Sequence, residues 1–172
     1  MLPISFTKGS INHNKVYYRE FKSIFRKMEI KIREITHYCP EIVDTINRFV
    51  SQLTGNESVI TMQQLEAIVS DPNSHLFFAM NDEGEYQGMI SVGIYTTPTG
   101  RKAWIEDVVV DELYRGQGVG KALTLFAIQY AKEEQAEVIM LTSNPTRINA
   151  NKLYKKVGFE TKDTNVYRMI LK

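Results

Sequence analysis

The 172-residue sequence predicts an α/β (α+β) domain with a mixed, mostly antiparallel sheet and four helices. Two observations carry this prediction. Six short apolar segments are typical of strands, and four longer segments repeat apolar residues at helical spacing. The strands in the middle of the chain follow one another through short turns, which favours antiparallel hairpins.

The N-terminal part of the domain is predicted to contain one strand and two helices. Isoleucines alternate with charged residues over 30–35, as they do in a half-exposed strand. A helix is expected over 40–53, because a proline suits its first turn and apolar residues recur at helical spacing. Thr61 and Gln64 have the spacing of a capping box, which predicts a second helix that ends near residue 69.

The rest of the domain is predicted to continue with hairpin strands and then to alternate helices with strands. The expected elements are strands over 75–80, 88–95 and 104–110, a helix over 119–134, a strand over 138–141, a helix over 147–157 and a last strand over 166–171. Polar turns that contain glycine or proline separate the hairpin strands.

The first 27 residues differ from the rest of the chain. They carry six lysine or arginine residues against the single acid Glu20, and they show no strand alternation. We therefore divide the chain into a basic N-terminal extension over 1–27 and a domain over 28–172. We expect Met28 to be the natural start.

Composition narrows the class of ligand. Lys and Arg number 21 against 20 Asp and Glu, so bulk charge does not favour nucleic acid or an anionic membrane as a partner. The single cysteine, Cys39, cannot form an internal disulfide, and no Cys/His cluster has metal-ligand spacing, so no metal is expected. No apolar run has the length of a membrane span, and no secretory signal is recognisable. We expect a cytoplasmic protein that binds small ligands.

A glycine turn at residues 115–120, Arg-Gly-Gln-Gly-Val-Gly, is the most informative motif. It follows an apolar strand segment and precedes a helix, so several backbone N–H groups are left unpaired at the helix start. The helix dipole adds about half a positive charge there, and this geometry binds phosphate. Glycines at 116, 118 and 120 allow the main chain to approach a ligand closely. The turn therefore predicts a ligand that carries a pyrophosphate.

Two familiar phosphate-binding motifs do not fit this turn. A nucleotide-hydrolysing loop ends in Gly-Lys-Ser/Thr, whereas Gly120 and Lys121 are followed by Ala122, which lacks the hydroxyl group that would hold magnesium. A dinucleotide-binding fold places its glycine turn near the chain start, whereas this turn lies two-thirds of the way along the chain.

Two motifs together resemble the GNAT superfamily of N-acetyltransferases, which transfer acetyl from acetyl-coenzyme A to an amine. The glycine turn resembles the family's Arg/Gln-x-x-Gly-x-Gly/Ala pyrophosphate loop. Residues 150–159, Ala-Asn-Lys-Leu-Tyr-Lys-Lys-Val-Gly-Phe, resemble its Ala-x-x-Leu-Tyr-x-x-x-Gly-Phe signature. Both motifs occur in the usual order and at the usual separation, and the resemblance runs from about Met28 to Lys172.

The resemblance implies the GNAT fold, with a V-splayed sheet of six to seven strands, and acetyl-coenzyme A as co-substrate. The pantetheine arm is expected to pair with the backbone of Val108, Val109 and Val110. The pyrophosphate is expected at the backbone amides of the glycine turn, formed by Arg115, Gly116, Gln117, Gly118, Val119, Gly120 and Lys121.

Two acids precede the glycine turn on the same predicted strand, Glu106 and Asp107. An amine must lose a proton before it attacks a thioester, and a carboxylate in a cleft can take it. Adjacent strand residues face opposite sides of a sheet, so only one of the two acids faces the cleft unless a bulge intervenes. We predict Glu106 as the catalytic base, because this segment resembles the corresponding strand of glucosamine-phosphate acetyltransferases. The alternative is that both acids only cap or pair at the surface.

Tyr154 is the second predicted catalytic residue. In the family the matching tyrosine often lies near the coenzyme sulfur, and a phenol is protonated at neutral pH and can therefore donate a proton to a thiolate. Asn151 lies one turn earlier on the same helix face and is predicted to bond the pantetheine amide. The family usually has asparagine seven positions before the tyrosine, whereas this chain has Arg147.

The sequence supports three hypotheses about function. The first is an acetyl-coenzyme A dependent N-acetyltransferase that acts on an amine of a small molecule or a protein. The second is a non-catalytic acyl-coenzyme A sensor, and the third is a nucleic-acid or membrane adaptor that uses residues 1–27. Exposed strand edges are compatible with a homodimer.

Overall fold

The computed structural model describes residues 30–57 and 59–171. The extension over 1–27, and Met28 with it, lies outside the described residues. The elements are β1 (Lys31–Glu34), α2 (Pro40–Thr54), α3 (Met62–Ser70), β2 (Ser74–Met80), β3 (Tyr86–Thr97), β4 (Gly100–Val110), the 3-10 turn η1 (Glu112–Tyr114), α4 (Val119–Glu133), β5 (Val138–Leu141) and α5 (Ile148–Lys156). The α+β class and the four predicted helices are confirmed.

The first two helices end and begin as their sequences predict. α2 ends at Gly55, which has a left-handed φ of 73° and donates its N–H to Ser51 O at 2.8 Å. α3 begins with the predicted capping box. Thr61 Oγ1 accepts a hydrogen bond from Gln64 N, and the Gln64 side chain accepts one from Thr61 N.

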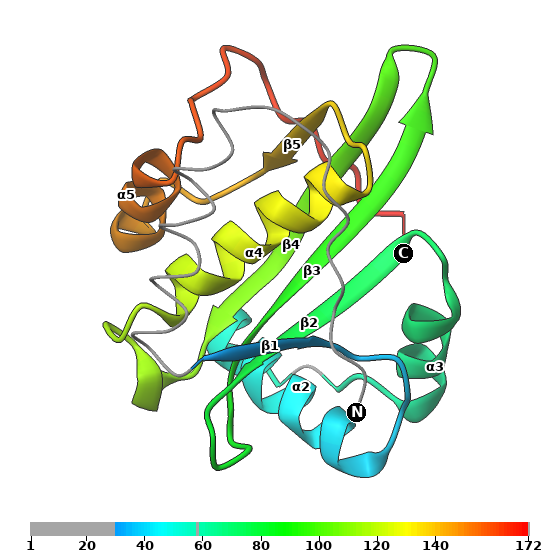
Figure 1. Ribbon diagram of the computed structural model, residues 1–172, viewed down its shortest axis with the longest axis vertical. Coiled ribbons are helices and arrows are strands. Elements are labelled where there is room, and N and C mark those ends of the chain that lie inside the picture. Colours follow the sequence, from blue (N-terminus) through cyan, green and yellow to red (C-terminus); the bar gives the residue numbers. More distant parts are fainter. Residues whose placement is uncertain (1–29, 58, 172) are drawn as a thin grey trace, which may run out of the picture.

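The five strands form one mixed sheet in the order β1-β2-β3-β4-β5 (Figure 1). The first four strands are antiparallel neighbours, and β5 pairs with β4 in parallel. β3 and β4 are longer than the sequence predicts, because their pairing continues to Thr97 opposite Gly100. Gly100 has a φ of 111°, so this turn favours a residue without a side chain.

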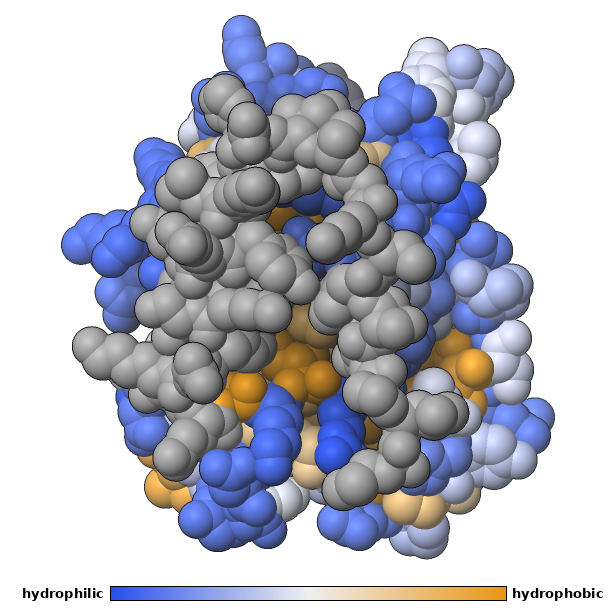
Figure 2. Space-filling view, viewed as in Figure 1, coloured by the Kyte–Doolittle hydropathy of each residue, from blue (hydrophilic) through white to orange (hydrophobic). Residues whose placement is uncertain are grey.

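Each face of the sheet is covered by its own hydrophobic core. α4 lies along the face of β3 and β4 in Figure 1, where Leu123 and Ala127 pack against Ile90 and Ile105. α2 and α3 cover the other face, and Phe49 and Leu65 belong to its core. Strand residues therefore alternate between the α4 face and the α2 face. The visible described surface in Figure 2 is mostly hydrophilic at its periphery, and hydrophobic residues gather nearer its centre.

The prediction of a last strand over 166–171 is wrong. The chain has no regular secondary structure there, and its apolar side chains, among them Tyr167 and Ile170, are exposed. The apolar pattern favours a strand, but a strand also needs a neighbour for its hydrogen bonds, and none lies beside this segment in the described chain. The sheet therefore has five strands in the described residues, in place of the expected six to seven.

Candidate functional site

β4 carries a bulge near its middle. The pairing with β3 shifts by one residue between Met89 and Ser91, so Ile90 lies opposite two residues, Asp107 and Val108. Asp107 has a φ of 47°, in the left-handed region. The sequence analysis allowed for such a bulge without predicting it. Because strict alternation is interrupted at Asp107, Glu106 and Asp107 need not face opposite sides of the sheet.

The same part of β4 lacks a strand on its other side. β5 pairs with β4 only as far as Ile105, which lies opposite Leu141. We call residues 106–110 the open edge of β4, because within the described chain they have a strand neighbour only in β3. The predicted pantetheine-binding valines lie here. The Val109 side chain is buried in the α2-face core, so this residue offers a ligand its backbone.

Two carboxyl groups lie at the start of the open edge in different surroundings. Glu106 is exposed, and its Oε1 accepts a hydrogen bond from Trp104 Nε1 at 2.7 Å. Asp107 is also open to solvent, yet burial raises its pKa. The two neighbouring carboxyl groups therefore differ in that only Glu106 has a hydrogen-bond partner among the described residues.

The glycine turn presents a row of unpaired amides. Gly116 and Gly118 have left-handed φ angles of 77° and 86°, and α4 begins at the next residue, Val119. The first hydrogen bond of α4 runs from Ala122 N to Gly118 O at 3.0 Å, so the amides of residues 118–121 have no backbone acceptor in the described chain. The sequence predicts the amides of residues 115–121 as pyrophosphate donors, but those of Arg115 and Gln117 donate to Glu112 O and Tyr114 O at 3.4 Å. Within the described chain, the unpaired part of the predicted row is therefore residues 118–121, together with Gly116.

Side chains of the turn fold it back onto the end of β4. Arg115 Nε donates to Val110 O at 3.3 Å, and Gln117 Nε2 donates to Leu113 O at 3.0 Å. Arg115 and Gln117, both predicted to bind the pyrophosphate, therefore also hold the turn in shape through their side chains. Lys121 lies in the first turn of α4, beside the unpaired amides.

The glycine turn is open on one side and tightly packed on the other. A Cβ atom at Gly116 would meet nothing within 4 Å, whereas one at Gly120 would lie 3.3 Å from Val110 Cγ2 and 3.4 Å from Leu153 Cδ2. Gly120 is therefore where α4 approaches both the end of β4 and α5. Unpaired amides with an open side fit a pyrophosphate group.

α5 carries the second predicted catalytic residue. Tyr154 is buried, and burial raises its pKa, while the charge of Arg147 acts in the opposite direction. Its ring lies 6.0 Å from that of Phe159, centroid to centroid. Asn151 Nδ2 donates to Asn144 O and to Arg147 O, both at 2.9 Å. Because these two bonds use the side-chain nitrogen of Asn151, its side-chain oxygen is the group that remains for the predicted contact with pantetheine.

α2 is attached to both sides of the open edge. Arg48 forms an ion pair with Asp111, whose side chain is only 2% exposed. Gln52 Oε1 accepts a hydrogen bond from Glu112 N at 3.1 Å. On the other side, Arg147, the residue just before α5, donates to Leu53 O at 2.7 Å. The sequence argument missed these attachments, because partners so far apart in the chain leave no local spacing signal.

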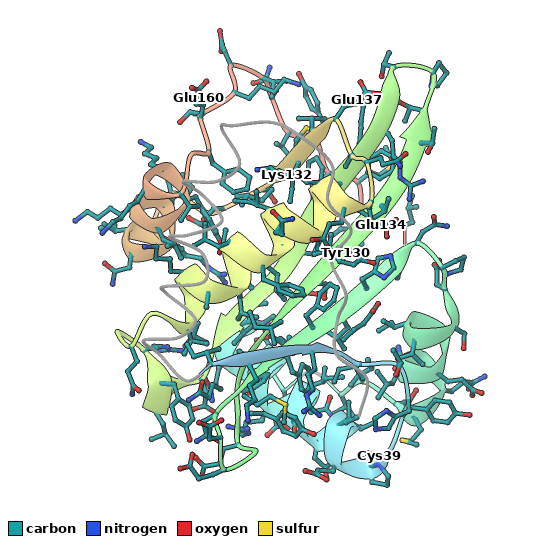
Figure 3. All side chains as sticks on the ribbon, viewed as in Figure 1. Cys39, Tyr130, Lys132, Glu134, Glu137 and Glu160 are labelled. Atoms are coloured by element: carbon teal, nitrogen blue, oxygen red, sulfur yellow. The ribbon has the colours of Figure 1, made fainter. Side chains whose placement is uncertain are left out.

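Other reactive side chains lie away from this site. Cys39 is at the start of α2, well separated from α5 (Figure 3). His75 Nδ1 lies 2.8 Å from Glu34 Oε1 and 2.8 Å from Tyr130 OH, near the C-terminal end of α4. In the described part of the chain no group of three His, Cys, Asp or Glu side chains is arranged to hold a metal ion. No described helix is both long and apolar enough to cross a membrane.

These features together define a class of protein. The described chain combines a strand with an open edge, a turn of unpaired amides that follows it and a buried tyrosine. The profile described as "Acetyltransferase (GNAT) family" matches residues 42–159, and the chain belongs to this family. It is an acetyl-coenzyme A dependent N-acetyltransferase that acts on an amine.

Curated relatives and solved structures agree with this assignment. The chain is 28% identical over 141 residues to the aminoalkylphosphonate N-acetyltransferase of Salmonella typhimurium, a match that covers 78% of this chain and 90% of that protein. It is 35% identical over 81 residues to the thialysine N-epsilon-acetyltransferase of Sus scrofa, covering 44% of this chain and 48% of that protein. The chain thus spans about half the length of the second relative.

Two solved structures show the same fold. A protein from Bacillus halodurans C-125, described as a transcriptional regulator, matches with a TM-score of 0.70 and 27% identity over 82% of this chain and 99% of that one. The glucosamine-6-phosphate N-acetyltransferase of Arabidopsis thaliana matches with a TM-score of 0.66 and 24% identity over 81% of this chain and 97% of that one. At 24% identity the second match shows a shared fold alone.

Proposed function

We propose that this enzyme moves acetyl from acetyl-coenzyme A to the primary amine of a small molecule by direct attack on the thioester. The observation that carries the proposal is that the open edge of β4 is followed, after the short turn η1, by the unpaired amides of residues 118–121. This arrangement offers an extended pantetheine arm a strand edge and offers the pyrophosphate a cradle. Acetyl-coenzyme A supplies the activated acetyl group.

The chain's own residues then divide into those that bind and those that move protons. Backbone groups of Val108, Val109 and Val110 and the amides of residues 118–121 hold the coenzyme. Glu106 takes a proton from the arriving ammonium group, because its carboxylate is exposed at the start of the open edge and is held there by Trp104. Such general-base assistance contributes about 10²- to 10⁴-fold in rate.

Tyr154 is proposed as the proton donor to the departing sulfur. Burial raises the pKa of its phenol, so the hydroxyl keeps its proton at neutral pH. Its position on α5, next to Leu153, is beside the glycine turn and the end of β4.

The acceptor is proposed to be a small amine. The relative whose match covers 78% of this chain is named for an aminoalkylphosphonate, and the relative whose match covers 44% is named for thialysine. Both names describe small molecules with a primary amine. A protein amine remains the alternative acceptor, to be separated by experiment.

The test is to follow thiol release from acetyl-coenzyme A over a panel of aminoalkylphosphonates, amino acids, polyamines, amino sugars and short peptides, with calorimetry of coenzyme binding alongside. Turnover with one class of small amine supports the proposal. Turnover with peptides alone would point to a protein acceptor. Tight binding without turnover on any amine would favour the acyl-coenzyme A sensor, and absence of binding would overturn the site.

Two variants assign the roles. Glu106→Gln is expected to leave coenzyme affinity intact and to slow turnover, with a defect that shrinks at high pH as free amine becomes abundant. Tyr154→Phe is expected to lower kcat more than it changes the KM for either substrate. An unchanged kcat would reduce the tyrosine to a packing residue.

A further inference from the structure

Asp107 holds a backbone conformation that its side chain makes costly. Its φ of 47° is one of two positive φ angles at non-glycine positions in the described chain, the other being 60° at Gln135. Aspartate tolerates this region better than most residues, but glycine adopts it without strain. An outlier of this kind, placed at a candidate active site, is a reason to ask what the side chain does there.

The Asp107 carboxyl group has no partner among the described residues. It makes no hydrogen bond and no ion pair with them, whereas its neighbour Glu106 is held by Trp104 at 2.7 Å. Burial raises its pKa, and the neighbouring charged group on β4 is Glu106. Within residues 30–57 and 59–171, Asp107 is therefore neither a structural cap nor one half of a salt bridge.

The chemistry of the proposed transfer needs more than one proton acceptor. A protonated amine must lose one proton to expose its lone pair, and the same nitrogen must lose a second once its bond to the acetyl carbon has formed. As the carbon–sulfur bond breaks, Tyr154 gives its proton to sulfur and regains one of the two protons that nitrogen loses, and the other proton goes to solvent. One carboxylate can take the first proton, and the second must also have an acceptor near the nitrogen.

We propose that Asp107 is a second general base of this reaction, which takes the proton that the nitrogen loses after the new nitrogen–carbon bond forms. Glu106 takes the earlier proton from the ammonium group. The inference rests on the proposed function, and it follows from the bulge, which sets two acids side by side at the start of the open edge with only one of them engaged.

The two carboxylates are then distinguished by the pH dependence of their variants. Asp107→Asn keeps a side chain that tolerates the left-handed region and removes the base. It is expected to lower kcat about 10²-fold or more at every pH between about 7 and 10, since the second proton has to leave however the amine arrives. The Glu106→Gln defect instead shrinks across the same range. Coenzyme affinity by calorimetry is expected to stay within about twofold of the parent in both variants.

A stability measurement separates lost chemistry from lost folding. Since the pKa of Asp107 is raised in the folded state, its carboxyl favours folding only at acid pH, and this contribution is lost as the pH rises through the raised value. At neutral pH the Asp107→Asn variant is therefore expected to melt at or above the temperature of the parent. A variant that is more stable and less active has lost a functional group and not its fold.

Asp107→Gly gives the decisive test, with Gln135→Gly as its matched control. Both replace a strained non-glycine residue and are expected to raise Tm by about 2–4 °C. Only Asp107→Gly is expected to lose activity, and sodium formate is expected to restore part of it in this variant and not in the parent or the control. Formate can occupy the space of the missing carboxylate and accept the proton.

The outcomes separate the two proposals. A parent enzyme that binds no coenzyme or acetylates no amine means that the proposed function fails. A parent that turns over, with Asp107→Asn at parental kcat or with Asp107→Gly inactive and indifferent to formate, means that only the second base fails and that the residue shapes the bulge. Formate rescue together with a pH-independent Asp107→Asn defect establishes the second base.

Discussion

The ion pair between Arg48 of α2 and Asp111 at the end of β4 allows a quantitative prediction. The Asp111 side chain is 2% exposed, and besides Arg48 it has the amide of Leu113, which donates to its Oδ1 at 3.1 Å. Replacing one partner of a buried pair strands the other charge and typically costs about 3–5 kcal/mol. Arg48 is 47% exposed, so water screens the pair, and we expect the lower value of about 2–3 kcal/mol for Arg48→Met.

The matched control is the exposed ion pair between Lys31 and Asp82, whose side chains are 55% and 49% exposed. Lys31→Met is expected to cost under about 1 kcal/mol. Since each kcal/mol shifts Tm by about 2–4 °C in a domain of this size, the expected losses are about 5–10 °C for Arg48→Met and at most a few degrees for the control. Thermal and urea unfolding, followed by the fluorescence of Trp104, measures both.

The double variant Arg48→Met/Asp111→Asn completes the test. It removes the stranded charge and keeps an oxygen acceptor for the Leu113 amide, so it is expected to be more stable than Arg48→Met alone. Coenzyme affinity is expected to fall several-fold in Arg48→Met, because Asp111 leads directly into the glycine turn. A loss no larger than that of Lys31→Met, or a double variant as unstable as the sum of its singles, would refute the reasoning.

Three further predictions concern single positions. Gly88→Ala is expected to cost about 1–3 kcal/mol in urea unfolding, because its Cβ would lie 2.5 Å from Val109 O and force β3 away from the bulge. Thr61→Ala is expected to cost about 1 kcal/mol in the same assay, because it removes the capping box of α3; a loss below about 0.3 kcal/mol would contradict this. Stability is expected to be full below pH ~10 and to fall as the pH rises through the raised pKa of Tyr154, so Tm measured against pH should fall less steeply in Tyr154→Phe.

Local signals predicted most of the fold. Proline at the start of α2, glycine after its end and the Thr61–Gln64 capping box act within a few residues, and each appears where the sequence places it. The last strand over 166–171 is wrong because an apolar pattern says nothing about whether a neighbouring strand exists. β3 and β4 are longer than predicted because cross-strand pairing extends both beyond their apolar centres.

The candidate site could be predicted in part for the same reason. The glycine turn and the signature around Tyr154 are contiguous motifs, so their residues were named from the sequence. The attachments of α2 and the role we propose for Asp107 depend on partners distant in the chain and on a bulge. No composition or spacing rule marks where one strand takes an extra residue, although two neighbouring acids within an otherwise apolar strand segment are a hint.

The bulge in β4 also makes this strand unequally tolerant of different kinds of genetic change. A substitution at Asp107 alters one side chain, whereas deletion of that single codon would restore an unbroken alternation through the strand. Val108 alone would then lie opposite Ile90, so Val109 would stay in the α2-face core and Val108 and Val110 would stay on the α4 side. Deletion of Ala103, in the regular part of the strand, has no extra residue to absorb it and would exchange the faces of the side chains on one side of the deletion. In a deep mutational scan, in-frame deletion of Asp107 should therefore be tolerated in terms of abundance and lose activity, whereas deletion of Ala103 should not be tolerated.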